Sequence, residues 1–188
     1  MNLKAVKAKK EILDKFQNLS LIMQIDNNDK RLVEELDYKT FLSILSFKSA
    51  QFNSPCYERR LQLKGCKKIP PSENKGDFKF PMFEKNIELK MSFSNKENKI
   101  NMRQIRIWQD CDYIVCFCDF NNINHKCYFL THEQMMEEVK KRGSATHGTL
   151  TANKDNKNIE YSITLNIIDN DWDLKYTANK ELKTFIFS

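Results

Sequence analysis

Near the middle of the chain, two acidic residues have the spacing needed to hold a metal ion, and a lysine lies beside them. Asp77 follows Gly76, and Glu88 lies eleven residues further on, with Lys90 two positions after it. Residues two apart in a strand point to the same face, so Glu88 and Lys90 are expected to share one face of a sheet. If Asp77 opens the preceding strand, a short turn brings its carboxylate close to that of Glu88.

Such a pair of carboxylates is unfavourable without a ligand, because each raises the pKa of the other. A hard divalent cation removes the conflict. Magnesium prefers oxygen ligands and keeps several waters, through which it can engage substrate phosphates. It would polarise a scissile phosphate and lower the pKa of an attacking water, while Lys90 positions that water and stabilises charge on the phosphorus oxygens. The spacing therefore indicates phosphodiester hydrolysis.

Hydrophobic periodicity predicts the elements that must position these side chains. Helical spacing is found in the N-terminal third, over residues 2–25, 32–45 and from Ser54-Pro55 toward Gly65. Period-two alternation begins after Gly76 and predicts strands around Phe78–Met82 and Ile87–Phe93. The later predicted elements are a helix over Ile100–Gln109, a doubly buried central strand over Tyr113–Cys118, a strand over Cys127–Leu130, a capped helix from Thr131 to Gly143 and a strand over Ile159–Ile167.

This order predicts an α/β fold with a single domain, in which a small central mixed sheet is flanked by helices. The chain has 188 residues, which suits one domain with a sizeable core. We expect a helical N-terminal part over 1–53, a catalytic core over 54–120 and a DNA-recognition part over 121–188.

At these residues the chain resembles a known family. Gly76-Asp77-Phe78 followed by Ile87-Glu88-Leu89-Lys90 is similar to the signature of PD-(D/E)XK nucleases, and most resembles type II restriction endonucleases. The resemblance covers roughly residues 54–120, with Gly76 where the family name has proline. It implies a restriction-endonuclease-like core in which Asp77, Glu88 and the Leu89 carbonyl ligate Mg²⁺ and Lys90 serves the water.

The resemblance also implies further residues and partners. Glu58 falls where many members carry an extra acidic residue, and Gln104 falls on the predicted helix after the strand of Glu88, where a polar side chain often contacts the active site or DNA. The implied activity is site-specific cleavage of double-stranded DNA that leaves a 5′-phosphate and a 3′-hydroxyl. A homodimer would match a palindromic site, and a cognate DNA methyltransferase would be the genetic neighbour.

Further residues are candidates for DNA contact. Arg103 and Arg106 share a face of the predicted helix, where they bind phosphates or make surface ion pairs. The loop after the helix that ends near Arg142 contains Ser144, Thr146, His147 and Thr149. It is either an ordinary helix C-cap and turn or a loop that reaches a phosphate or base edge.

Each feature also has an ordinary structural interpretation. Asp77 is alternatively a turn residue, Glu88 and Lys90 the solvent face of an amphipathic strand, and Glu58 a surface helix residue. Their joint occurrence favours a nuclease. The rival functions are a structure-specific repair or phage-type endonuclease and a non-catalytic DNA-binding protein of the same fold.

Composition is compatible with these expectations. The net charge of +6 suits a polyanionic partner. The six cysteines have no CxxC spacing, and no signal peptide or membrane-length apolar run is recognisable, so we expect reduced thiols and a cytoplasmic location. A zinc site built from Cys116, Cys118 and their neighbours Cys111, His125 and Cys127 is disfavoured relative to buried free thiols.

Overall fold

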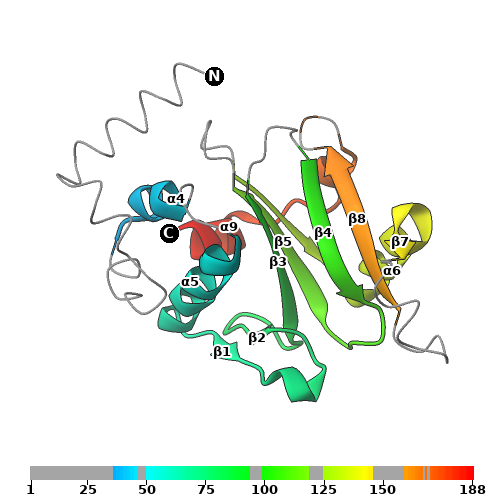
Figure 1. Ribbon diagram of the computed structural model, residues 1–188, viewed down its shortest axis with the longest axis horizontal. Helices are drawn as coiled ribbons and strands as arrows, with labels where there is room; N and C mark the ends of the chain where they lie inside the picture. The colour runs from blue at the N-terminus through cyan, green and yellow to red at the C-terminus, as the bar shows by residue number, and fades with distance from the viewer. Residues whose placement is uncertain are drawn as a thin grey trace.

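The computed structural model describes residues 36–45, 50–93, 99–118, 125–145, 159–166, 168 and 170–188 (Figure 1). The helix predicted over residues 2–25 lies outside them. The helices are α4 (Tyr38–Leu45), α5 (Ala50–Leu63), α6 (His132–Arg142), α8 (Trp172–Lys175) and α9 (Lys180–Phe187), with a 3-10 turn at Pro71–Glu73. The strands are β1 (Lys67–Lys68), β2 (Phe78–Lys79), β3 (Ile87–Phe93), β4 (Lys99–Arg106), β5 (Asp112–Cys118), β6 (Lys126–Leu130), β7 (Ser144–Ala145) and β8 (Glu160–Asn166).

The strands described form two sheets. The larger has the order β1-β2-β3-β5-β6, in which β3 and β5 are parallel and the other neighbours antiparallel. The smaller is an antiparallel sheet with the order β4-β8-β7. The predicted α/β class with a mixed sheet and helices is confirmed, and the structure adds a second sheet of β4, β7 and β8 that the sequence analysis did not predict.

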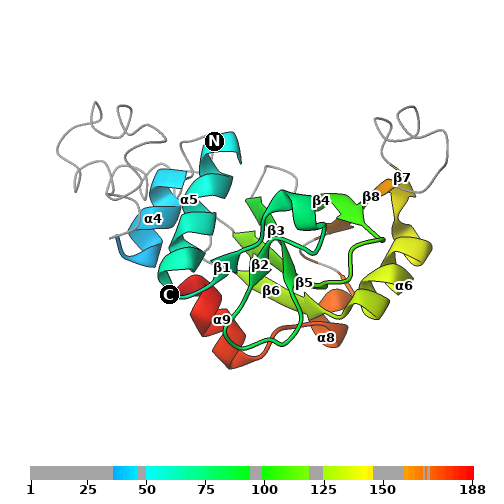
Figure 2. The same cartoon turned by 90° about the horizontal axis from the view of Figure 1, so that it is seen from below.

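The larger sheet is covered differently on its two faces. Helices α4, α5 and α9 lie on one side, and α6 lies on the other with β4 and β8 (Figure 2). The helical side has a core that includes Phe41, Tyr57, Leu61, Ile87 and Ile186. A second core between the two sheets and α6 includes Ile105, Tyr113, Val115, Met135 and Trp172. Together the two cores make β5 inaccessible on both faces, as predicted for Tyr113–Cys118.

Several predicted boundaries hold for local reasons. Thr131 caps α6 through a capping box with Gln134, and the helix ends at Gly143, as predicted. The predicted strand after Gly76 is shorter than expected, because Pro81 has no N–H to continue a ladder beyond Lys79.

The predicted start of a helix at Ser54-Pro55 is wrong. Both residues lie inside α5, which starts at Ala50. A proline in the second turn removes only one backbone hydrogen bond, and the packing of Tyr57 and Leu61 into the core offsets that loss.

The helix predicted over Ile100–Gln109 is also wrong, since this segment is strand β4. Ile100 and Met102 are buried with period two, but the next buried residue is Ile105. The register with β8 shifts by one residue between Met102 and Ile105, and Gln104 has φ +56°. This β-bulge inserts an extra residue into the alternation, so the apolar spacing imitates a helix.

Among the described residues, none of the helices is long and apolar enough to cross a membrane.

The bulge gives a prediction about Gln104. A non-glycine residue at positive φ is strained, and a β-branched one is more so. Gln104→Gly is expected to leave the free energy of unfolding unchanged or higher, and Gln104→Val to lower it by about 1–2 kcal/mol. Urea unfolding followed by circular dichroism measures both; equal stability of the two variants would contradict the bulge geometry.

Candidate active site

The Asp77 carboxylate is fixed against the middle of β3. The Asp77 amide donates to the Ile87 carbonyl at 2.9 Å, which aligns the end of the loop with the start of β3. The Asp77 Oδ2 then accepts a hydrogen bond from the Leu89 amide at 3.0 Å. Because Leu89 lies between Glu88 and Lys90, these two bonds place Asp77 next to the strand segment that carries both predicted residues.

Gly76 is what allows this approach. It has φ +87°, and a Cβ at this position would lie 3.0 Å from the carbonyl carbon and oxygen of Ile87. A proline has φ near −65° and could not adopt this conformation. The glycine in place of the family's proline is therefore a requirement of the local backbone.

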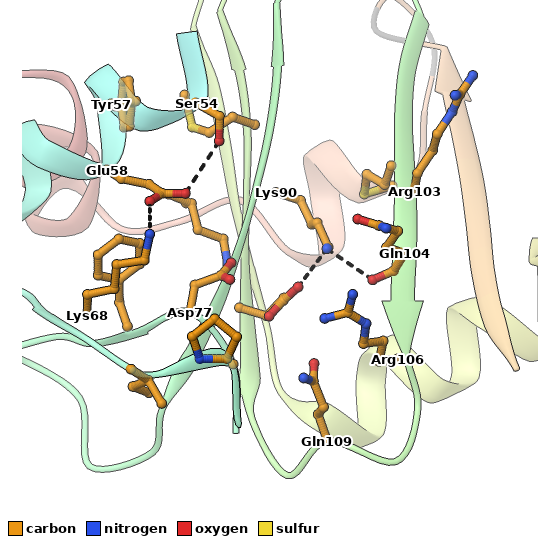
Figure 3. A pocket seen from close by; sticks show the side chains of 18 of the residues that line it. Ser54, Tyr57, Glu58, Lys68, Asp77, Lys90, Arg103, Gln104, Arg106 and Gln109 are labelled. Carbon is orange, nitrogen blue, oxygen red and sulfur yellow. Dashed lines mark hydrogen bonds and ion pairs between the residues drawn. The ribbon is translucent and has the colours of Figure 1, made fainter. Parts of the chain in front are cut away.

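Glu88 and Lys90 point to the same face of β3, as predicted from their spacing. The Glu88 residue is only 3% exposed, and its Oε1 pairs with the Lys90 Nζ at 2.6 Å. The Lys90 Nζ also donates to the Gln104 carbonyl of β4 at 3.0 Å. The ammonium is thus held between the two sheets (Figure 3).

These groups line a cavity of about 550 Å³. Its floor is β3, one wall comes from α5, β1 and the start of β2, and the other wall comes from β4 and the turn after it. The cavity is large enough for a phosphodiester with its neighbouring sugar and several waters. It thus lies between β3 of the larger sheet and β4 of the smaller one.

The electrostatics of Asp77 reflect its neighbours. The pKa of Asp77 is raised to about 6, mainly by burial and then by the negative charges of Glu88 and, more weakly, Glu58, against the lowering effects of the Leu89 amide and Lys90. The Asp77 carboxylate is therefore costly to ionise beside Glu88. A bound cation would offset this cost.

The donor atoms fit a hard divalent ion. Neither Asp77 Oδ1 nor Glu88 Oε2 has a hydrogen-bond partner among the described residues. The amide and carbonyl of one strand residue face the same side, so the Leu89 carbonyl faces the same edge as its amide, toward Asp77. Two carboxylate oxygens and one carbonyl would leave positions for water, as magnesium prefers. No group of three or more His, Cys, Asp or Glu side chains with metal-binding geometry occurs among the residues described.

Another buried carboxylate provides a comparison. Glu138 is also 3% exposed, but it accepts hydrogen bonds from Trp172 Nε1 at 2.9 Å and from the Tyr176 hydroxyl at 3.1 Å, and it pairs with Arg142 at 2.7 Å. Its oxygens are thus satisfied by the protein. Within the described ranges Glu88 has only Lys90 as a partner, so its remaining oxygen is available to a ligand.

Glu58 lines the same cavity from α5. Its carboxylate pairs with Lys68 of β1 and accepts a hydrogen bond of 3.5 Å from the Ser54 hydroxyl. Its charge contributes to the raised pKa of Asp77. The structure therefore brings Glu58, paired with Lys68, to the same cavity as Asp77 (Figure 3).

The predicted residues on the segment after β3 lie on a strand and not on a helix. Gln104 reaches the site through its carbonyl, which the bulge turns toward Lys90, and its side chain is exposed. Arg106 lines the cavity, as Figure 3 shows, but also pairs with Glu160 of β8 at 2.9 Å. Arg103 is exposed and points away from Lys90. The shared helical face predicted for the two arginines is therefore wrong.

The predicted DNA-binding loop is described only in part. Ser144 lies in β7, where its hydroxyl is 3.0 Å from that of Ser162, and it does not line the cavity. Thr146, His147 and Thr149 lie outside the described residues. The DNA-binding role of this loop stays a prediction.

Gln109 is a cavity residue that the sequence analysis missed. It follows β4 in a turn, is 3% exposed and lines the cavity, and its side chain points toward Arg106 (Figure 3). Its Oε1 is buried and has no hydrogen-bond partner in the part of the chain that the structure describes. A buried acceptor without a partner is unfavourable and indicates a place for a bound water or ligand donor.

The cysteines are separate from this site. All six are buried and free of disulfides. Cys116 and Cys127 face each other across β5 and β6, with 3.7 Å between their sulfur atoms.

Comparison with protein-family models, curated proteins and solved structures finds no match for this chain. The interpretation of the site therefore depends on its own residues and geometry.

The raised pKa of Asp77 gives a pH-dependent prediction. A folded-state pKa above the unfolded value means that the stability of the metal-free protein falls as pH rises from about 4 through about 6. Asp77→Asn removes this loss. At pH 7.5 without metal, we therefore expect the free energy of unfolding of the variant to exceed that of the wild type by on the order of 1 kcal/mol. Magnesium should raise the melting temperature of the wild type and not of the variant.

The same titration bears on metal affinity. Protons and the cation compete for Asp77, so the magnesium affinity of the wild type should fall about tenfold per pH unit below pH 6. Calorimetric titration between pH 5 and 8 measures this. An affinity independent of pH across that range would show that Asp77 does not ligate the ion.

Gln109 gives a further prediction. Gln109→Leu keeps the volume but removes the unpaired acceptor, so the free energy of unfolding without metal should rise by about 1 kcal/mol. Gln109→Glu should lower it, because it adds a third carboxyl beside Glu88. Urea unfolding checks both variants; destabilisation by leucine would indicate that the amide has a structural partner.

Proposed function

We propose that this chain is a magnesium-dependent endonuclease that hydrolyses phosphodiester bonds in double-stranded DNA. The observation that supports this most is that the Asp77 and Glu88 carboxylates and the Lys90 ammonium line one cavity, with an oxygen of each carboxylate unused by the residues that the structure describes. The resemblance of Gly76-Asp77 and Glu88-Leu89-Lys90 to PD-(D/E)XK nucleases supports the same chemistry.

Asp77, Glu88 and the Leu89 carbonyl would hold the ion. Bound there, magnesium supplies Lewis acidity toward a phosphate oxygen and toward the attacking water. Lys90, held by Glu88 and the Gln104 carbonyl, donates a hydrogen bond toward the water or the phosphate and stabilises the charge that builds on the phosphorus oxygens. Hydrolysis would break the bond to the 3′ oxygen, leaving a 5′-phosphate and a 3′-hydroxyl.

Other cavity residues would bind around this centre. Arg106 carries a positive charge on the β4 wall, partly engaged by Glu160, and Lys68 carries one on the α5 wall, engaged by Glu58. Either is placed to attract a phosphate. Gln109 would accept a hydrogen bond from a water at the ion through its unpaired Oε1.

We further propose that the substrate site is short and specific, as in type II restriction endonucleases. One chain has one such centre, so cutting both strands of a palindrome would need a homodimer with one centre per strand. A DNA methyltransferase encoded nearby would then protect the host sites.

The test is cleavage of plasmid and phage DNA with and without magnesium. Asp77→Ala, Glu88→Gln and Lys90→Ala are each expected to lower the cleavage rate by about 100-fold or more, because each removes part of the charge stabilisation. Glu181→Gln, an exposed carboxylate in the first turn of α9, is the matched control and should cut at the wild-type rate.

The pattern of products separates the alternatives. A defined ladder of fragments would support a restriction activity, whereas preferential cutting of mismatches, flaps or junctions would support a structure-specific repair or phage-type endonuclease. Full cleavage by Glu88→Gln would refute the metal site, and DNA binding without metal-dependent turnover would support a non-catalytic role.

A further inference from the structure

Two lysines face each other on the ladder next to the cavity. Lys67 of β1 and Lys79 of β2 are direct partners in the antiparallel register, and both are exposed. Directly opposed residues on one sheet face have Cβ atoms about 5 Å apart, and like charges at such positions destabilise the pair. The pairing therefore adds nothing to the stability of the fold, and an anion between or above the two ammonium groups would make it favourable.

Both lysines point to the side of the sheet that has the metal-binding carboxylates. Phe78 is buried and pairs with Ile87, which is also buried, so these two side chains point into the helical core. Side chains alternate along a strand, so Lys79 points to the other face, with Glu88 and Lys90 of β3. Lys67 shares that face because it is opposite Lys79.

Neither lysine is engaged by an acidic residue of the protein. Within the described ranges, Lys67 and Lys79 form no ion pair or side-chain hydrogen bond, and Lys75 in the preceding loop is likewise exposed and unpaired. Other lysines near the cavity differ: Lys68 is paired with Glu58, and Lys90 with Glu88. The two opposed side chains, which we call the hairpin lysine pair, are therefore available to a ligand.

We propose that the hairpin lysine pair binds the phosphates of the DNA strand that is cut, next to the scissile phosphate on the β1–β2 side of the cavity. This inference rests on the proposed function. Lys67 and Lys79 are direct neighbours in the chain of Lys68 and Phe78, which line the cavity, and exposed Arg103 lines it from the opposite side, on β4. A strand lying across the cavity would thus find positive charge on both sides of the acidic centre.

The experiment measures equilibrium binding of fluorescein-labelled DNA, with calcium in place of magnesium to prevent turnover. The variants are the charge reversal K67E/K79E, the conservative K67R/K79R and the control K140E/K180E. Lys140 and Lys180 are exposed, and neither lies on an element that lines the cavity, so the control changes net charge by the same amount.

We expect the hairpin reversal to weaken binding about tenfold or more, and the control and the arginine variant to bind like the wild type. Each lost phosphate contact lowers the slope of log affinity against log salt by about 0.9 for duplex DNA and about 0.7 for a single strand. Loss of the pair should therefore lower the slope by about 1.8 or 1.4, respectively. Circular dichroism and melting curves establish that each variant is folded.

Binding by K67E/K79E equal to that of K140E/K180E, with an unchanged salt slope, would overturn the proposal. So would a melting temperature of Lys79→Gln well below that of the wild type, because relief of a like-charge pair should not destabilise the fold. If the wild type binds DNA through the hairpin lysine pair but never cuts it with magnesium, the proposed nuclease activity fails and the docking surface stands. If the wild type cuts DNA and the hairpin reversal binds normally, the docking surface fails and the nuclease activity stands.

Discussion

The closeness of two carboxylates is the constraint on which the organisation of the cavity depends. Asp77 and Glu88 repel each other, and the pKa of Asp77 rises to about 6 through burial and the charge of Glu88. The fold tolerates the pair because the Leu89 amide binds Asp77 and Lys90 pairs with Glu88. Gly76 then allows the loop to approach β3 closely enough for the first of these contacts. A divalent cation bound between the two carboxylates would offset their repulsion.

The two-sheet architecture gives this pair a place that is buried and yet open to a ligand. Cores cover β5 on both faces, and β3 pairs with β5 along its whole length while its own apolar side chains pack into the helical core, so the strand that carries Glu88 and Lys90 is firmly held. The second sheet approaches β3 through β4, and its bulge turns the Gln104 carbonyl toward Lys90. The strained backbone at Gln104 thereby positions the Lys90 ammonium. The buried Glu138, with three protein partners, instead has a structural role.

Charge is distributed around the site in a way that suits a polyanion. The acidic centre is flanked by Arg106 and Arg103 on β4 and by Lys67 and Lys79 at the β1–β2 ladder. The net charge of +6 would attract a polyanion from a distance. The basic side chains around the cavity would then orient it across the acidic centre. Proteins often retain unfavourable surface charge where a ligand neutralises it, and the opposed lysines have this character.

The sequence by itself determined those features that depend only on residues close together in the chain. The Glu88–Lys90 spacing, the Thr131 cap and the apolar run Tyr113–Cys118 were predictable because strand alternation, capping and burial are properties of short segments. Only the tertiary structure decided that Ile100–Gln109 contains a strand. The β-bulge that interrupts the two-residue alternation of its apolar side chains forms only through pairing with β8. Likewise, the second sheet, the unpaired Gln109 acceptor and the alignment of Lys67 with Lys79 arise from contacts between distant segments, which no local spacing encodes.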